Sequence, residues 1–174
     1  MRLAAAFLAA RKEAEIEELD LTQEGLIPID SALLSERDRL VAEKKFDDPI
    51  FRYARQFAAA DEIVLSAPYW DLSFPSLVRC YWERVSICGL TFSYSGEGVP
   101  VGHCRAKRIT YITTAGGYLG AYNHGFEYVR DLCRFYFGIQ QAACIAAEGL
   151  DIIGNDPEAI LREAMARAEA AARY

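Results

Sequence analysis

The stretch from Asp61 to Gly89 constrains the fold of this chain most. A short apolar run, Ile63 to Ala67, leads into Pro68-Tyr69-Trp70-Asp71, and a helix starts after Pro75. Open α/β sheets bind their ligands where a buried strand ends and its loop begins. The stretch therefore predicts a buried strand whose following loop, rich in aromatic side chains, lines a ligand site.

A second strand runs into a loop of small residues. The strand is expected at Arg108 to Thr113, and the loop reads Thr114-Ala115-Gly116-Gly117-Tyr118. Gly116 and Gly117 permit a close approach between backbone and ligand, which a β-carbon would block. A plain strand-to-helix turn explains the two glycines equally well. Two such loops side by side at one sheet edge would hold a flat cofactor.

Helical and strand patterns alternate along the rest of the chain. Helices are predicted at 2–13, 31–44, 50–60, 76–88, 123–137 and from 157 onward, and strands at 14–21, 63–67, 108–113 and 140–147, with 91–94 extended and 95–102 a loop. Asp48, Asn123 and Asp156 are placed to cap helices, and Gly138 to end one. Such alternation indicates parallel strands with helices on both faces. We expect a single α/β domain over residues 1–174.

Composition narrows the class of protein. The net charge of −6 gives no field that attracts phosphate backbones, so nucleic acid is not expected as a partner. The five cysteines form no CxxC pair and predict reduced thiols in a cytoplasmic protein. Leu3 to Ala10 follows Arg2 as in a signal peptide, but charges follow at once, which favours an amphipathic helix. No run reaches the ~20 apolar residues of a membrane span.

A family resemblance runs in order through nearly the whole chain. The segment APYWDLSFPSLVRCYWERVSICGLTFSYSGEG, followed by a basic strand and TTAGGY, resembles the FMN-dependent NADH:quinone oxidoreductases, or azoreductases, of the flavodoxin-like superfamily. The resemblance implies a flavodoxin-like three-layer α/β/α sandwich. It also implies FMN as the cofactor, NAD(P)H as the electron donor, quinone-like or azo acceptors, and a homodimer.

The resemblance assigns the two loops to the flavin ring. The implied cofactor-binding residues are Tyr69, Trp70, Asp71, Leu72, Thr114, Ala115, Gly116 and Gly117. Their backbone amides would donate to the carbonyls and N5 edge of the flavin and stabilise the charge that develops on reduction. Asp71 stands where the family commonly has Asn, and Ala115 replaces a larger residue. Both differences predict an altered potential or acceptor preference.

His124 is the candidate catalytic residue. It follows the glycine-rich loop at the first turn of a predicted helix, where the neutral imidazole is favoured and suits a hydrogen-bond donor. A solvated residue at a helix start is the alternative. His103 and Cys104 are adjacent but lack a third ligand at suitable spacing, so no metal site is expected.

The start of the chain departs from the family pattern. Family members open with a strand and a serine-rich phosphate loop, whereas residues 2–13 read as a helix. In the flavodoxin-like order 2-1-3-4-5 that first strand is central. Two explanations are open: the chain is a truncated or mis-started form, or its strand at Glu15–Leu19 pairs directly with Ile63–Ala67. We expect weak or no FMN binding without the phosphate loop.

An apolar and aromatic face is predicted on the helix after Pro75. Its members are Leu77, Tyr81, Trp82 and Val85, with Phe92 and Tyr94 beyond the helix. Core packing explains about half of such a set, and the excess predicts a homodimer contact. The rival to a flavoenzyme is therefore a non-catalytic flavodoxin-like module that binds a protein partner. An electron carrier fits less well, because this helix carries Arg79 and Arg84 rather than an acidic rim.

Overall fold

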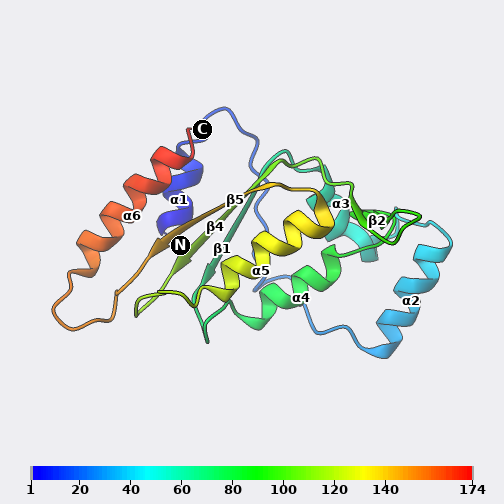
Figure 1. The fold of residues 1–174 in the computed structure, drawn as a ribbon, viewed down its shortest axis with the longest axis horizontal. Helices are drawn as coiled ribbons and strands as arrows, with labels where there is room; N and C mark the ends of the chain where they lie inside the picture. Colours follow the sequence, from blue (N-terminus) through cyan, green and yellow to red (C-terminus); the bar gives the residue numbers. More distant parts are fainter. Residues whose placement is uncertain (1, 174) are drawn as a thin grey trace.

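The computed structural model describes residues 2–173 and contains a central parallel sheet (Figure 1). The sheet has the order β1-β4-β5 and is built from β1 (Ile63–Pro68), β4 (Arg108–Thr114) and β5 (Gln141–Ala147). Ile63 lies opposite Ile109 in the first pair, and Arg108 opposite Gln141 in the second. This order corresponds to the last three strands of the flavodoxin order 2-1-3-4-5.

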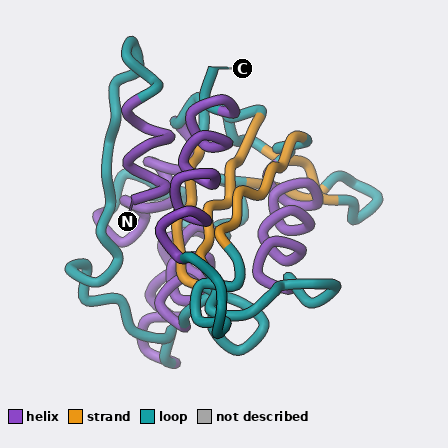
Figure 2. The backbone as a smooth tube through the Cα atoms, turned by 90° about the vertical axis from the view of Figure 1, so that its left-hand side faces the viewer, coloured by secondary structure: helices purple, strands orange, loops and turns teal. Residues whose placement is uncertain are grey.

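Helices cover both faces of this sheet, as the alternation predicts. On one face α1 (Arg2–Ala9) and α6 (Pro157–Ala171) lie side by side, and on the other are α3 (Arg52–Ala59), α4 (Ser76–Val85) and α5 (His124–Leu132) (Figures 1 and 2). The flavodoxin-like sandwich predicted from the sequence is confirmed.

β4 separates the two core clusters that pack on the faces of the sheet. Ile109 and Tyr111 pack with Trp82 and Phe137 on the α3–α4–α5 side, whereas Ile112 packs with the helices α1 and α6. All residues from Ile109 to Thr113 are buried because β4 is the middle strand and both of its faces are covered. The carboxyl end of this strand is therefore held rigidly.

The helix caps form where the sequence predicts them, but the helices predicted at 2–13 and 76–88 end earlier, at Ala9 and Val85. Asn123 accepts the N–H of Phe126 at 3.1 Å and starts α5, and Asp156 caps α6 by accepting the N–H of Glu158 at 3.0 Å. Asp48 accepts the N–H of Ile50 and begins the short helix η1 (Pro49–Phe51) ahead of α3. After α5 the chain continues as a π-helical turn, η2 (Cys133–Phe137), and Gly138 closes it at φ 76°.

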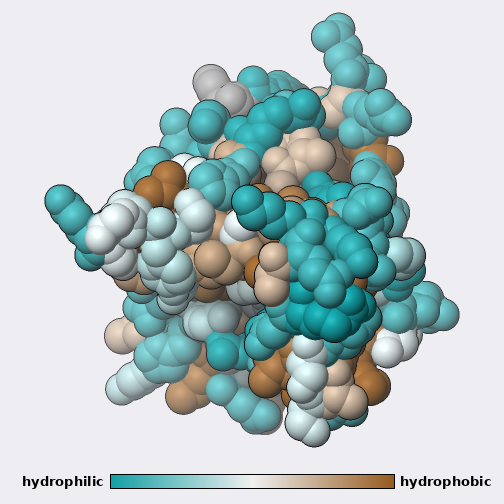
Figure 3. All heavy atoms as spheres, turned by 90° about the vertical axis from the view of Figure 1, so that its right-hand side faces the viewer, coloured by the Kyte–Doolittle hydropathy of each residue, from teal (hydrophilic) through white to brown (hydrophobic). Residues whose placement is uncertain are grey.

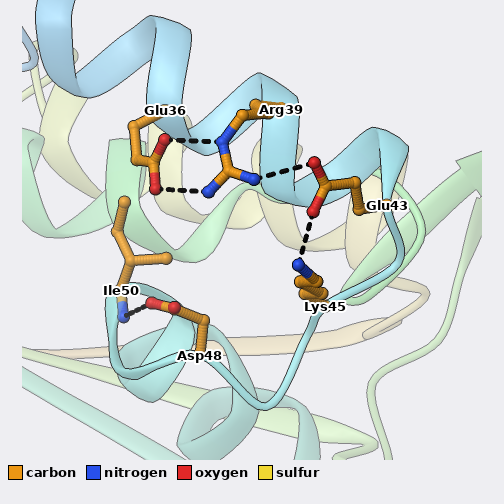
Figure 4. Close-up of polar contacts among 6 residues, drawn as sticks. All are labelled: Glu36, Arg39, Glu43, Lys45, Asp48 and Ile50. Carbon is orange, nitrogen blue, oxygen red and sulfur yellow. Dashed lines mark hydrogen bonds and ion pairs between the residues drawn. The ribbon is translucent and has the colours of Figure 1, made fainter.

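Helix α2 (Ser31–Ala42) lies at the surface, at the opposite end of the molecule from α6 (Figure 1). Leu40 is its one buried residue. A ladder of charges stabilises the helix: Arg39 bridges Glu36 and Glu43 at 2.7 Å each, and Lys45 binds Glu43 beyond the helix end (Figure 4). Pairs at this spacing each contribute a few tenths of a kcal/mol, about 0.2–0.5.

A small hairpin was missed by the sequence analysis. Strands β2 (Phe92–Tyr94) and β3 (Pro100–Gly102) pair antiparallel, although residues 95–102 read as a loop. The pairing depends on Gly102, which lies directly against the backbone of Phe137 and Gly138. The end of the molecule that includes α2 carries mostly hydrophilic side chains with apolar groups scattered among them (Figure 3).

The strand predicted at 14–21 is wrong. This segment forms no strand, and residues 13–18 are exposed, with Ile16 at 47%. Four glutamates in this stretch favour solvent over a sheet edge. The alternative in which Glu15–Leu19 pairs with β1 is therefore wrong as well. Leu19 and Leu21 still pack against the core. Among residues 2–173, β1 pairs with β4 alone.

The predicted contact face on α4 is wrong for two of its four residues. Trp82 is 1% exposed and Val85 is fully buried, both inside the core. Trp82 packs edge-on against Phe57 and parallel to Phe137. Leu77 and Tyr81 are half-buried against the same cluster. The aromatic side chains on this helix are thus mainly core residues.

Candidate functional site

The loop after β1 forms a tight turn that projects from the carboxyl edge of the sheet. Trp70 and Ser73 exchange backbone hydrogen bonds at 3.0 and 2.8 Å around Asp71 and Leu72. Both central residues have positive φ, 48° and 66°. Non-glycine residues in this region cost about 1–2 kcal/mol each, and such positions concentrate at functional sites. Trp70 is 60% exposed beside this turn.

The loop after β4 lies against the first loop, as the sequence predicts. Tyr69 donates its backbone N–H to the carbonyl of Thr114 at 2.9 Å, which joins the two loops at their bases. Ala115 is buried, and its N–H donates to Ala147 at 2.8 Å. The second loop therefore leaves the sheet in a fixed direction, and Tyr118 at its far end is 68% exposed.

A third loop, residues 148–155, was missed by the sequence analysis. It follows β5 and lies alongside the second loop, where Gly149 donates to Gly117 and Asp151 to Gly116, each at 2.9 Å. The carboxylate of Glu148 accepts the N–H of Leu119 at 2.8 Å. The signal available in the sequence is that β5, like β1 and β4, ends at the same edge of a parallel sheet.

Several amides of the first two loops are not used within the fold. Among residues 2–173, no hydrogen bond is made by the backbone N–H groups of Asp71, Leu72, Gly116, Gly117 and Tyr118. A β-carbon on Gly117 would meet no atom within 4 Å, so this residue faces open space. Unbonded amides beside exposed aromatic rings fit the carbonyl-lined edge and flat faces of an isoalloxazine ring. Asp71, Leu72, Gly116 and Gly117 thus fit that group. The prediction that the amides of Tyr69 and Ala115 donate to the flavin is wrong, because both are hydrogen-bonded within the fold.

His124 lies next to the first loop, where the sequence places it. Its backbone N–H donates to the carbonyl of Leu72 at 3.1 Å, and its Nδ1 atom is 2.9 Å from Oε2 of Glu127. The imidazole is exposed on the rim of a cavity of about 520 Å³, whose other lining residues are Ser73, Phe74, Arg79, Glu127, Tyr128 and Asp131. Its side chain can therefore reach a molecule bound beside the first loop.

Buried polar groups lie beneath these loops. The hydroxyl oxygens of Tyr111 and Thr113 make no hydrogen bond of acceptable geometry among the described residues. Burial raises the pKa of Tyr111 to about 12. Burial also raises the pKa of the Cys144 thiol to about 11, although Asn123 donates to that sulfur at 3.5 Å. These groups stay protonated at neutral pH and form an uncharged floor.

Comparison with known proteins gives the family. The chain matches the family described as flavodoxin-like fold over residues 1–172. It is 37% identical over 167 residues to FMN-dependent NADH:quinone oxidoreductase 2 of Clostridium acetobutylicum, covering 91% of this chain and 80% of that protein. The corresponding protein of Coprothermobacter proteolyticus is 35% identical over 172 residues, with 94% and 83% covered.

The chain belongs to the FMN-dependent NADH:quinone oxidoreductase family. Solved structures agree with this assignment. An azoreductase of Bacillus anthracis matches with a TM-score of 0.82 at 25% identity, covering 98% of this chain and 87% of that one. An FMN-dependent NADH-azoreductase of the same species, solved in complex with FMN, shares the fold with a TM-score of 0.81 at 23% identity, with 99% and 89% covered.

Neither a metal cluster nor a membrane-spanning helix occurs among residues 2–173. No group of three histidine, cysteine, aspartate or glutamate side chains there could hold a metal ion. Within the same residues, no helix is long and apolar enough to cross a membrane. The three loops at the carboxyl edge of the sheet are the candidate site because they carry or support the unbonded amides.

Proposed function

We propose that this chain is an FMN-dependent oxidoreductase that transfers reducing equivalents from NAD(P)H to quinone-like or azo acceptors. The observation that carries the proposal is the set of unbonded amides on the two abutting loops, in a chain of this family. The family names and the loop geometry support the same cofactor from independent directions.

The first two loops would hold the flavin ring. Bound FMN would supply the redox chemistry, accepting a hydride from the nicotinamide and passing it to the acceptor. The amides of Gly116 and Gly117 would donate to the ring's carbonyl edge, and those of Asp71 and Leu72 to the opposite edge. The exposed ring of Trp70 would pack on the flavin and exclude water. The backbone fixes these donors in advance, so no reorganisation is needed on binding.

Side chains at the rim would orient the acceptor. The Nδ1 atom of His124 lies 2.9 Å from Oε2 of Glu127, and a proton on Nδ1 leaves Nε2 as a hydrogen-bond acceptor at the rim of the cavity. We propose that this nitrogen accepts a hydrogen bond from an O–H or N–H group of the acceptor or of its reduced product. Asp71 carries an exposed carboxylate beside the ring position, which would disfavour negative charge on a reduced flavin. Asp71→Asn is then expected to raise the flavin potential.

A titration with FMN tests the proposal. The purified chain would be titrated while flavin fluorescence is followed, and NADH oxidation would then be measured with a soluble quinone and with an azo dye. Saturable quenching with acceptor-dependent NADH oxidation supports the proposal. Saturable quenching without NADH oxidation would favour an electron carrier. No quenching would favour a non-catalytic module that binds a protein partner.

Three further expectations belong to this proposal. We infer that residues 1–174 form a single domain, and we expect one cooperative thermal transition. The five free thiols support a reducing compartment such as the cytoplasm.

We also propose a homodimer. Its contact would use exposed side chains such as Trp70 and Tyr122, each 60% exposed, rather than the buried Trp82 and Val85. Sedimentation velocity measures whether the chain is a monomer or a dimer.

A further inference from the structure

The path of the second loop is fixed by residues about thirty positions further along the chain. The carbonyls of Ala115, Gly116 and Gly117 accept the N–H groups of Leu150, Asp151 and Gly149 at 3.2, 2.9 and 2.9 Å. The loop carbonyls are thus engaged by the third loop, whereas the N–H groups of Gly116 and Gly117 are not engaged within residues 2–173. The third loop therefore acts as the support of the second.

Glu148 makes a different kind of contact with this loop. Its Oε2 atom accepts the N–H of Leu119 at 2.8 Å in a partly buried position, and the side chain of Leu119 is 5% exposed. A hydrogen bond from an amide to a carboxylate is shorter and stronger than a neutral one. Gly117 is held through its carbonyl and Leu119 through its N–H, so the segment between them is fixed at both ends.

Gly149, the residue after Glu148, is held from later in the same loop. Asn155 donates its side-chain amide to the carbonyl of Gly149 at 2.7 Å. Gly149 has φ 76°, and a β-carbon there would lie 2.8 Å from Nδ2 of Asn155 and 3.0 Å from the ring of Tyr118. The glycine therefore lets the third loop turn tightly enough for the Glu148 carboxylate to reach Leu119.

We propose that Glu148 is a positioning residue for the flavin-binding loop. Its carboxylate fixes Leu119 and thereby holds the unbonded amides of Gly116, Gly117 and Tyr118 in the orientation that receives the flavin ring. This inference rests on the proposed function, which makes FMN the ligand of this loop. Because the Glu148 contact orders the loop before the cofactor binds, less conformational entropy is lost on binding.

Two measurements on the whole chain test this inference. Hydrogen exchange of the Leu119 amide is measured without FMN, and FMN affinity is measured by fluorescence quenching. Glu148→Ala removes the acceptor, whereas Glu148→Gln keeps a carbonyl oxygen in the same place. Glu163→Ala is the matched control, because Glu163 is exposed on α6.

The expected result is a contrast between the two substitutions. Glu148→Ala removes a charged acceptor, so it should accelerate Leu119 exchange and weaken FMN binding by about tenfold or more. Glu148→Gln should lose clearly less than Glu148→Ala in both measurements, since it keeps a neutral acceptor in the same place. Glu163→Ala should match wild type.

Other results would overturn the inference. Glu148→Ala that behaves like Glu163→Ala would show that the contact positions nothing, and Glu148→Gln as weak as Glu148→Ala would show that charge rather than the hydrogen bond matters. If the wild type binds no FMN, the proposed function fails and Leu119 exchange alone decides the role of Glu148. If Glu148→Ala does not fold, Asn155→Ala decides: faster Leu119 exchange supports the inference and unchanged exchange overturns it.

Discussion

Gly116 lies so close to Asp151 that a β-carbon on the glycine would be 2.1 Å from the aspartate Oδ2 atom. The next residue, Gly117, has no atom within 4 Å of its β-carbon position. Two adjacent glycines of one loop thus face different surroundings, the first facing the third loop and the second facing open space where the flavin is proposed to lie.

Alanine at these two positions should separate stability from cofactor binding. Gly116→Ala must displace the Asp151 side chain, so we expect a loss of about 1–3 kcal/mol of unfolding free energy. Gly117→Ala should keep the wild-type melting temperature and weaken FMN binding, because the methyl group enters the ligand space. Urea unfolding and FMN titration measure the two effects. Adding Asp151→Ala to Gly116→Ala should restore much of the lost stability, and no restoration would place the strain elsewhere.

Glu62 should contribute more to stability than its neighbour Asp61. Glu62 accepts Arg11 at 2.7 Å and Arg108 at 2.8 Å, and its side chain is 27% exposed. Glu62→Ala leaves two partly buried guanidinium groups without their partner, so we expect a loss of about 1–3 kcal/mol. Asp61 pairs with Arg105 at 82% exposure, and Asp61→Ala should cost less than about 0.5 kcal/mol. Equal losses in urea unfolding would contradict this assignment.

Gly102 should not tolerate a side chain. A β-carbon there would lie 2.1 Å from the carbonyl carbon of Phe137 and 2.3 Å from the nitrogen of Gly138, and backbone atoms cannot rotate away. We expect Gly102→Ala to lower the unfolding free energy by about 3 kcal/mol, at the upper end of overpacking. Gly96→Ala in the same hairpin meets nothing within 4 Å and is the control. A wild-type thermal transition for Gly102→Ala would show that β3 is not docked on η2.

Stability should fall as pH rises above about 9. Burial raises the pKa of the Cys104 thiol to about 12 and that of Cys144 to about 11 from 9.0, and that of Tyr111 to about 12 from 10.0. The folded state holds these protons more tightly than the unfolded state. Their contribution is therefore complete below the unfolded pKa values and is lost as pH rises toward the folded ones.

Urea midpoints between pH 7 and pH 11 measure this dependence. The midpoint should be flat near neutrality and then decline. Each fully titrating group adds about 1.4 kcal/mol per pH unit to the slope of the unfolding free energy against pH. Cys144→Ala should have a shallower decline than wild type. An unchanged slope in that variant would mean that Cys144 ionises as readily in the folded as in the unfolded chain.

Contacts between near neighbours in the chain could be predicted from residue type and spacing. The caps at Asn123 and Asp156 act within three residues, so residue type and spacing were enough to predict them. The apolar runs that became β1, β4 and β5 likewise signalled burial. Because parallel strands share an edge, the approach of the first two loops followed from strand order alone.

Contacts between residues far apart in the chain could not be predicted from the sequence and are seen in the tertiary structure. Nothing near Glu148 in the chain signals that its carboxylate reaches Leu119, which is 29 positions away. The burial of Trp82 depends on Phe57 and Phe137, and the β2–β3 hairpin depends on the fit of Gly102 against η2. Residues 14–21 form no strand, although β1 is an edge strand with β4 as its one partner among residues 2–173. Such outcomes depend on which surfaces meet, and local propensity carries no information about that.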